Sequence, residues 1–221
     1  MLDYKEQDNW PDHLSQWQSP LELSALQATK RQQTAQVINF STDYKFKTVV
    51  GKGNNLQYNG VGQTMIAGRT FEFQQLHFHF PAEHLVNGKT ASMELHFVQQ
   101  NAIGQLSVLA FLVETGTFNE QLAPPFYQHF TLNENEETVF AERLNMRALT
   151  AGRTQKVYRY LGSLTTPPLL RGVEWWVFEE PLTVSPTQLE TLRTDFASDN
   201  ARRVQKVNER PIVRYQIQPE R

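Results

Sequence analysis

The sequence predicts a mainly β fold, built as a single domain on a large, twisted and mostly antiparallel central sheet with a few short peripheral helices. Segments rich in β-branched and aromatic residues recur along the chain, and turn residues separate them. No repeat, low-complexity tract or Gly/Ser linker divides the 221 residues, and single all-β domains commonly reach about 200–250 residues. We therefore expect one domain over residues 1–221.

Four segments are expected to form strands of one sheet. They are residues 70–80, 92–100, 106–113 and 173–178. The first two are separated by a loop that contains Asn87 and Gly88, a pair that accepts positive φ in tight turns. Antiparallel pairing of these two segments is therefore expected, and it would bring His77 and His96 side by side.

The clearest helix is expected over residues 185–196. Ser185 can cap its N-terminus, Pro186 suits its first turn, and Gln188 completes a capping box with Ser185. Because apolar residues recur at helical spacing, the helix should bury one face. That face would consist of Leu189, Leu192 and Phe196.

Composition and charge exclude several classes of function. The formal net charge is −2 and the Lys and Arg residues are scattered, so we expect no nucleic-acid partner. No apolar stretch approaches the roughly 20 residues needed to cross a bilayer, and residues 1–10 lack the apolar run of a signal peptide. We therefore expect no membrane association. Cysteine is absent, so any metal chemistry must use histidine and carboxylate ligands.

Three histidines carry the strongest chemical signal. In residues 75–80 the strand period of two places Gln75, His77 and His79 on one face and apolar side chains on the other. The same rule places Glu94 beside His96 in the second strand. A metal-bound imidazole usually donates its other ring N–H to an oxygen that fixes its orientation, and Gln75 and Glu94 are placed to accept that hydrogen bond.

Any one of these histidines alone would more often be an ordinary hydrogen-bonded residue. Three on adjacent strands are different, because burying each unsatisfied polar group would cost about 1–3 kcal/mol. Three neutral nitrogens with an open fourth position are typical of catalytic zinc, whereas two histidines and a carboxylate would favour ferrous iron. The sequence therefore predicts a zinc site formed by His77, His79 and His96.

Several motifs resemble a known family, the α-class carbonic anhydrases, and bacterial members in particular. The similar segments are QSP at 18–20, QLHFHF at 75–80, AEHLVNGK at 82–89, MELHFV at 93–98 and GSLTTPPL at 162–169. They occur in the family's order over almost the whole chain. The resemblance implies a zinc lyase that reversibly hydrates carbon dioxide to bicarbonate and a proton, by attack of zinc-bound hydroxide.

The resemblance also assigns roles to individual residues of the metal site. It implies zinc ligation by His77, His79 and His96, with Gln75 and Glu94 orienting the first and the last. The backbone carbonyl of Asn200 would support His79. Glu83 and Thr165 would be the catalytic gating pair, in which the Thr165 hydroxyl donates to Glu83 and accepts from the hydroxide. His84 would be a buried structural residue bonded to Tyr160, and not a ligand.

The substrate pocket is likewise implied by the resemblance. Its apolar wall beside the metal would consist of Val98, Val108, Leu164, Val173 and Trp175, although plain sheet core would have the same composition. Further pocket contacts would come from Tyr4, Gln57 and Thr166. The residue that carries protons to the solvent in fast family members is a histidine, and Asn54 stands at the matching position. Asparagine does not titrate near neutral pH, so slow proton release is expected.

Two other functional classes are compatible with parts of this sequence pattern. One is a non-catalytic binding module on the same fold, against which the intact ligand and gating residues argue. The other is a β-rich metalloprotein such as a cupin dioxygenase, which would need a carboxylate ligand and leaves GSLTTPPL unexplained. The only partner expected is the small-molecule substrate, with a homodimer left open. We expect a cytoplasmic location, the alternative being a secreted or periplasmic protein whose signal has been removed.

Overall fold

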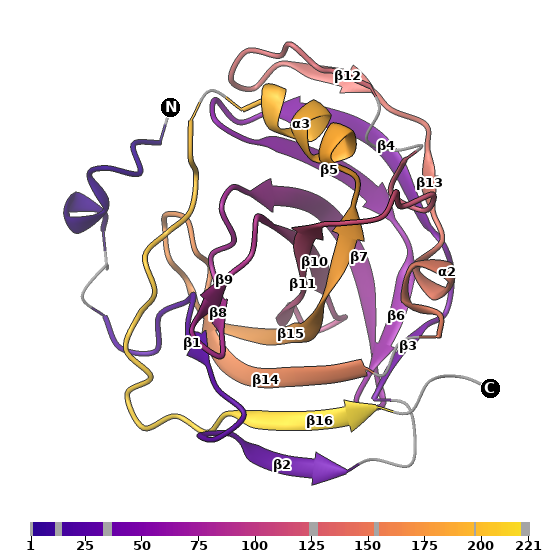
Figure 1. The fold of residues 1–221 in the computed structure, drawn as a ribbon. Coiled ribbons are helices and arrows are strands. Elements are labelled where there is room, and N and C mark those ends of the chain that lie inside the picture. The colour runs from indigo at the N-terminus through magenta and orange to yellow at the C-terminus, as the bar shows by residue number, and fades with distance from the viewer. Residues whose placement is uncertain are drawn as a thin grey trace.

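A computed structural model describes residues 2–11, 15–32, 37–123, 128–152, 155–196 and 198–217. Within these ranges most strands join one large sheet, which is strongly twisted and curls around the centre of the molecule (Figure 1). Its main path runs in the order β12 (Glu137–Val139), β4 (Tyr44–Gly51), β5 (Leu56–Val61), β7 (Arg69–His79), β10 (Met93–Gln100), β11 (Leu106–Thr115), β15 (Arg171–Val184), β14 (Gln155–Ser163), β16 (Val213–Ile217) and β2 (Thr29–Gln32).

Smaller elements flank this path. The strands β3 (Ile38–Phe40), β6 (Gln63–Ile66) and β13 (Arg143–Leu144) pair beside it, and a second small sheet contains β1 (Glu22–Leu23), β8 (Leu85–Val86) and β9 (Lys89–Thr90). The described helices are short: η1 (Gln7–Asn9), α2 (Met146–Thr150) and α3 (Pro186–Thr194). The mainly β prediction is therefore confirmed. None of the helices in the described ranges is long and apolar enough to span a membrane.

Most neighbouring strands in the large sheet are antiparallel, as expected. The exceptions on the main path are β11 with β15 and β16 with β2, which run parallel. The parallel pair β11–β15 follows from the long chain excursion between the two strands, since parallel neighbours need a crossover connection. The sheet is therefore mixed, with its parallel step beside the strands that carry the predicted ligands.

The predicted pairing of the two histidine strands is confirmed. β7 and β10 are antiparallel, His96 lies directly opposite His77, and Glu94 lies opposite His79. Asn87 and Gly88 both have positive φ, at 51° and 75°. They form the turn of the small β8–β9 hairpin within the connection, rather than joining β7 to β10 directly.

The side chains on the two faces of β7 lie in different environments. Leu76, Phe78 and Phe80 contribute to the larger apolar core on one face of the sheet. The other face carries His77 and His79. A smaller apolar cluster on that face includes Val98, Val108, Val173 and Trp175, against which Leu164 packs. The strand alternation predicted from the sequence therefore places apolar core residues on one face of β7 and the candidate metal ligands on the other.

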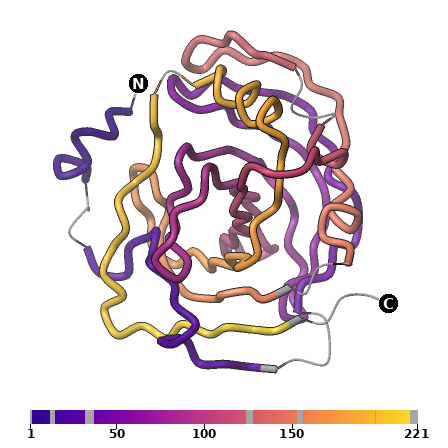
Figure 2. Tube along the Cα trace, in the orientation of Figure 1, coloured from indigo at the N-terminus to yellow at the C-terminus, as the bar shows by residue number. Residues whose placement is uncertain are grey.

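The predicted helix forms as α3, with the expected capping box. Ser185 Oγ accepts a hydrogen bond from Gln188 N at 3.2 Å, and Gln188 Oε1 accepts one from Ser185 N at 3.0 Å. Leu192 and Phe196 are buried, and Leu189 packs partly buried against the same core. After α3 the chain continues in an extended segment that passes beside the N-terminal residues, as the trace in Figure 2 shows.

Candidate metal centre

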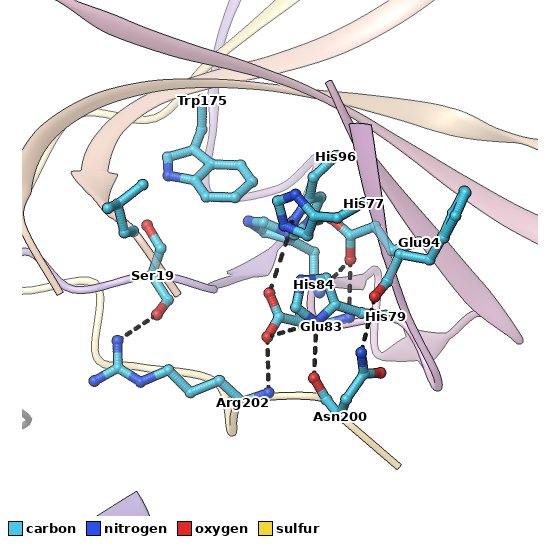
Figure 3. Close-up of polar contacts among 12 residues, drawn as sticks. Ser19, His77, His79, Glu83, His84, Glu94, His96, Trp175, Asn200 and Arg202 are labelled. Carbon is cyan, nitrogen blue, oxygen red and sulfur yellow. Dashed lines mark hydrogen bonds and ion pairs between the residues drawn. The ribbon is translucent and has the colours of Figure 1, made fainter. Parts of the chain in front are cut away.

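Three imidazole rings converge between β7 and β10. Their centroids are 5.1 Å apart for His77 and His79, 5.1 Å for His77 and His96, and 4.6 Å for His79 and His96. His79 and His96 are buried, and His77 is half-buried. One ring nitrogen from each residue lies within 4.8 Å of the others, so the three side chains could hold one metal ion (Figure 3).

Each imidazole uses its second nitrogen to bind a protein oxygen. His77 Nδ1 lies 2.8 Å from Gln75 Oε1, His79 Nδ1 lies 2.7 Å from the Asn200 carbonyl oxygen, and His96 Nε2 lies 2.9 Å from Glu94 Oε1. These oxygens can only accept, so the ring nitrogens facing them carry the protons. The tautomer of each ring is thereby set, and the lone pair of each remaining nitrogen faces the centre.

The remaining nitrogens lack hydrogen-bond donors. His79 Nε2 is buried without a hydrogen-bond partner among the described residues. His77 Nε2 and His96 Nδ1 are 3.3 Å apart, yet both are acceptors in the tautomers just assigned. Two nitrogens bound to zinc at about 2.0–2.1 Å in tetrahedral geometry would lie about 3.3–3.4 Å apart. A cation between the three rings would resolve all three unmet acceptors, so the donor set fits zinc.

The electrostatic environment keeps these imidazoles neutral, as metal ligation requires. Burial lowers the pKa of all three, and it lowers that of His79 to about 4. For His77 the neighbouring His96 and His79 add to this effect, because protonating one ring disfavours charge on the others. The site is therefore ready to bind a cation at neutral pH.

A second group of possible ligands shares His96 with the first. It consists of His84, Glu94 and His96. Both nitrogens of His84 already have partners, because Nδ1 lies 2.6 Å from Glu94 Oε1 and Nε2 lies 2.7 Å from the Tyr160 hydroxyl. This group has no unmet acceptor on His84, so it does not need a metal ion. The His84–Tyr160 contact expected from the sequence is present.

Glu94 organises the polar residues behind the metal centre. Its carboxylate also accepts the backbone N–H groups of Glu83 and His84, each at 2.8 Å. Burial alone would raise the pKa of Glu94, but the neighbouring His84 and His96 and their hydrogen bonds outweigh it and hold the pKa well below its usual range. Glu94 is therefore an ionised acceptor that fixes both His96 and the loop carrying Glu83.

Glu83 and Thr165, the expected gating pair, are both buried, and the Glu83 carboxylate lies close to two of the imidazoles, with Oε1 3.3 Å from His79 Nδ1. Glu83 Oε1 accepts the backbone N–H of Arg202 at 2.8 Å, and Glu83 Oε2 lies 4.0 Å from His96 Nδ1. Burial raises the pKa of Glu83 to about 7, against the opposing influence of His96, the Arg202 hydrogen bond and the Thr165 side chain. A cation in the site would favour the ionised form.

The segment after α3 contributes residues from far along the chain. Asn200 supports His79 through its carbonyl, and its side chain bonds the backbone of Phe78 and Phe80 at 2.9 and 2.8 Å. Arg202 adds the N–H on Glu83, and its guanidinium donates to the Ser19 carbonyl at 2.7 Å (Figure 3). The sequence interpretation included Asn200 but missed Arg202, whose only signal was its place two residues further on.

A cavity of about 250 Å³ opens beside His77. Its lining includes four residues expected at the pocket or the proton-shuttle position, namely Tyr4, Asn54, Gln57 and Thr166. Three lining residues were missed by the sequence interpretation: Leu2, Lys52 and Asn55. Burial, together with the nearby Glu83, raises the pKa of Tyr4, so its hydroxyl stays protonated at neutral pH.

Asn54 is buried rather than exposed at the mouth of this cavity. Its side-chain Nδ2 donates to the Leu2 carbonyl at 3.2 Å, and its backbone carbonyl accepts from Asn200 Nδ2 at 3.3 Å. His129, another histidine in the described ranges, is exposed and bonds Asp195 at 3.0 Å. His13 lies outside the described residues.

The large curled sheet and the three histidines on adjacent antiparallel strands define a mainly β fold with a candidate metal centre. The family model for eukaryotic-type carbonic anhydrases matches residues 5–216. The chain therefore belongs to the carbonic anhydrase family of this type, the α class. Membership makes it a carbonic anhydrase enzyme whose family reaction is the hydration of carbon dioxide.

Individual relatives agree with this assignment. The chain is 35% identical over 170 residues to a carbonic anhydrase of Pectobacterium atrosepticum, covering 75% of this chain and 68% of that one. The α-carbonic anhydrase of Thermovibrio ammonificans, solved with sulfanilamide, superimposes with a TM-score of 0.79 at 32% identity over 90% of this chain and 88% of that one. For the Photobacterium profundum α-carbonic anhydrase the TM-score is 0.78 at 30% identity, with 94% of each chain covered.

Proposed function

We propose that this enzyme hydrates carbon dioxide to bicarbonate at a zinc ion held by His77, His79 and His96. The observation that carries the proposal is the set of three unmet ring acceptors that face one another, each on an imidazole whose other nitrogen is already bonded to a protein oxygen. Zinc would supply a water of lowered pKa as nucleophile, chemistry for which carbonic anhydrases are themselves the reference example.

The protein's own contribution is to orient the nucleophile. An ionised Glu83 can only accept, so a Thr165 hydroxyl that donates to it has only its oxygen lone pairs left for the reacting water. That water must then donate to Thr165, and its own lone pair is directed away from Thr165 toward the substrate. The Arg202 N–H occupies Glu83 Oε1, and Glu83 Oε2 is buried without a hydrogen-bond partner among the described residues, so Oε2 is the atom that Thr165 would use.

Carbon dioxide carries no net charge or dipole, so an apolar surface suits it. Val98, Val108, Val173 and Trp175 form one apolar cluster on the sheet face that carries the histidines, with Leu164 packed against it. The Trp175 ring centroid lies 4.9 Å from that of His96. Trp175 is held in place because its Nε1 donates to the Ser163 carbonyl at 2.9 Å. We assign this surface to substrate and the polar cavity side, with Thr166 and Gln57, to bicarbonate release.

The test is stopped-flow hydration of carbon dioxide on protein of measured metal content. We expect one zinc per chain, loss of activity when a chelator removes it, and recovery on adding zinc but not ferrous iron. Recovery with iron alone would favour a dioxygenase-type site. Zinc-loaded protein without hydration activity would instead indicate a binding module.

We propose that proton release limits turnover, because the resemblance to the family aligns Asn54 with the shuttle histidine of its fast members. Among the described residues that line the cavity, the only histidine is His77, which is a proposed zinc ligand. Asn54→His should raise kcat by roughly tenfold, because a positioned imidazole can accept the proton, while kcat/KM stays nearly unchanged. Small imidazole buffers should raise kcat of the unmodified enzyme in the same way.

The matched control is Asn54→Gln, which enlarges the side chain and disturbs the bond to Leu2 without adding a titrating group. It should not raise kcat. If imidazole and Asn54→His both leave kcat unaltered, proton release does not limit this enzyme.

A further inference from the structure

The extended segment at residues 200–203 carries two bonds to the metal centre on alternating positions. The Asn200 carbonyl accepts from His79 at 2.7 Å, and the Arg202 N–H donates to Glu83 at 2.8 Å. The Ala201 carbonyl and the Arg203 N–H point to the opposite side, where both bond the side chain of Gln7. This alternation is that of a β-strand, with one edge facing the site.

Among the described residues, no strand pairs with the opposite edge of this segment, and residues 200–203 belong to no β-ladder. The side chain of Gln7 takes that place: its Nε2 donates to the Ala201 carbonyl at 3.1 Å, and its Oε1 accepts the Arg203 N–H at 2.9 Å. One carboxamide therefore makes the pair of hydrogen bonds that a neighbouring strand would make with alternate residues.

Every hydrogen-bonding group of the Gln7 carboxamide has a partner. It is only 7% exposed, and the second hydrogen of its Nε2 is donated to the Tyr4 carbonyl at 2.7 Å. Both donors and the acceptor of the carboxamide are thus bonded to backbone groups. Tyr4 lines the cavity beside His77, so the same side chain ties a cavity wall to the segment that reaches the metal centre.

We propose that Gln7 is a positioning residue for the metal centre, acting through residues 200–203 on His79 and Glu83. The inference rests on the proposed zinc site and gating pair. Hydrogen-bond partners of metal-bound histidines set the orientation and basicity of those ligands. Because residues 200–203 supply such a partner but belong to no β-ladder, another contact has to hold them in place. The buried Gln7 carboxamide holds this segment from the side opposite the site.

A nearby contact provides the matched control. Asp8 Oδ1 and Arg203 Nη2 form an ion pair at 2.6 Å between the same two segments, but their side chains are 78% and 61% exposed. Exposed pairs of this kind contribute little. Asp8→Asn therefore removes a link between the N-terminal residues and the segment without touching the carboxamide pairing.

The test follows the ring N–H protons of zinc-free, ¹⁵N-histidine-labelled protein by NMR. In Gln7→Met, which keeps the side-chain length but loses all three hydrogen bonds, the His79 Nδ1–H should exchange with solvent about tenfold faster, while the His77 proton bonded to Gln75 is unaffected. In the zinc-loaded protein the metal should dissociate about tenfold faster, the lower end of such effects. Gln7→Glu, which keeps an acceptor for the Arg203 N–H, should lie between Gln7→Met and the unmodified protein. Asp8→Asn should change neither measurement.

An unchanged exchange rate of the His79 ring proton in Gln7→Met would overturn the positioning role. Equal acceleration of proton exchange at His77 and His79 would overturn it as well. If Gln7→Met does not fold, the same comparison is made with Gln7→Glu alone, and an unchanged His79 proton there overturns the proposal equally. Because the proton measurement needs no zinc, it is separable from the proposed function: the enzyme could hydrate carbon dioxide with no effect of Gln7, or the His79 proton could respond in a protein that proves inactive.

Discussion

His96→Ala is expected to remove nearly all bound zinc and to lower the rate of carbon dioxide hydration by on the order of 10³-fold or more, since the chemistry depends on the metal. The substitution deletes one of three converging nitrogens and leaves the Glu94 carboxylate without the ring it orients. Two histidines and no thiolate form a poor zinc site. Zinc content after dialysis against a chelator, with stopped-flow rates on the same samples, measures both effects.

His79→Ala and His84→Gln separate the two possible ligand groups. His84 belongs only to the group with Glu94, and both of its nitrogens are hydrogen-bonded. His79 belongs only to the three-histidine group and has a buried nitrogen without a partner among the described residues. We therefore expect His79→Ala to lose zinc and His84→Gln to keep about one zinc per chain. The reverse result would assign the metal to His84, Glu94 and His96.

Local sequence pattern predicted the ligand strands because strand alternation is a property of neighbouring residues. Gln75, His77 and His79 had to share a face once residues 70–80 were read as a strand, and the structure places them so. The pairing of His77 opposite His96 needed only antiparallel neighbours with a short connection. These parts of the site depend on one hairpin-like region, which is why they could be read from the sequence.

Long-range contacts could not be read in the same way. Asn200 and Arg202 reach His79 and Glu83 from about 120 positions away, as hydrogen-bond separations of 121 and 119 residues show. Periodicity contains no information about such a contact, and Asn200 was found only through the family motif. Nothing in the sequence pointed to Gln7. A buried glutamine whose carboxamide makes the hydrogen bonds of a neighbouring strand has the same sequence pattern as any polar residue in such a segment.

Burial was also hard to predict from the sequence. The resemblance aligned Asn54 with the shuttle histidine of the family, but it gave no indication of how exposed the side chain is. The structure buries it against the Leu2 carbonyl, since the N-terminal residues pass over it. The apolar wall of the pocket could not be distinguished from ordinary core either. Valines that face a substrate and valines in a sheet core have the same sequence pattern.

Thr165→Val is expected to retain zinc and to lower kcat/KM for hydration by roughly 10²-fold, because it removes an orienting hydrogen bond and leaves the nucleophile in place. Valine matches threonine in volume, so the buried turn that carries the residue should be preserved. The measurement should be kcat/KM rather than kcat. If proton release limits kcat, a slower chemical step is partly hidden in kcat but fully visible in kcat/KM.

Thr165→Ser is the rescue variant, since it restores the hydroxyl without the methyl group. It should recover most of the lost kcat/KM, whereas Thr166→Val, at the next position of the same turn, should not reproduce the loss. Thr166 lines the cavity beside His77. Turnover unchanged in Thr165→Val, or a loss that Thr165→Ser fails to recover, would mean that the hydroxyl does not orient the reacting water and that the turn serves only to shape the pocket.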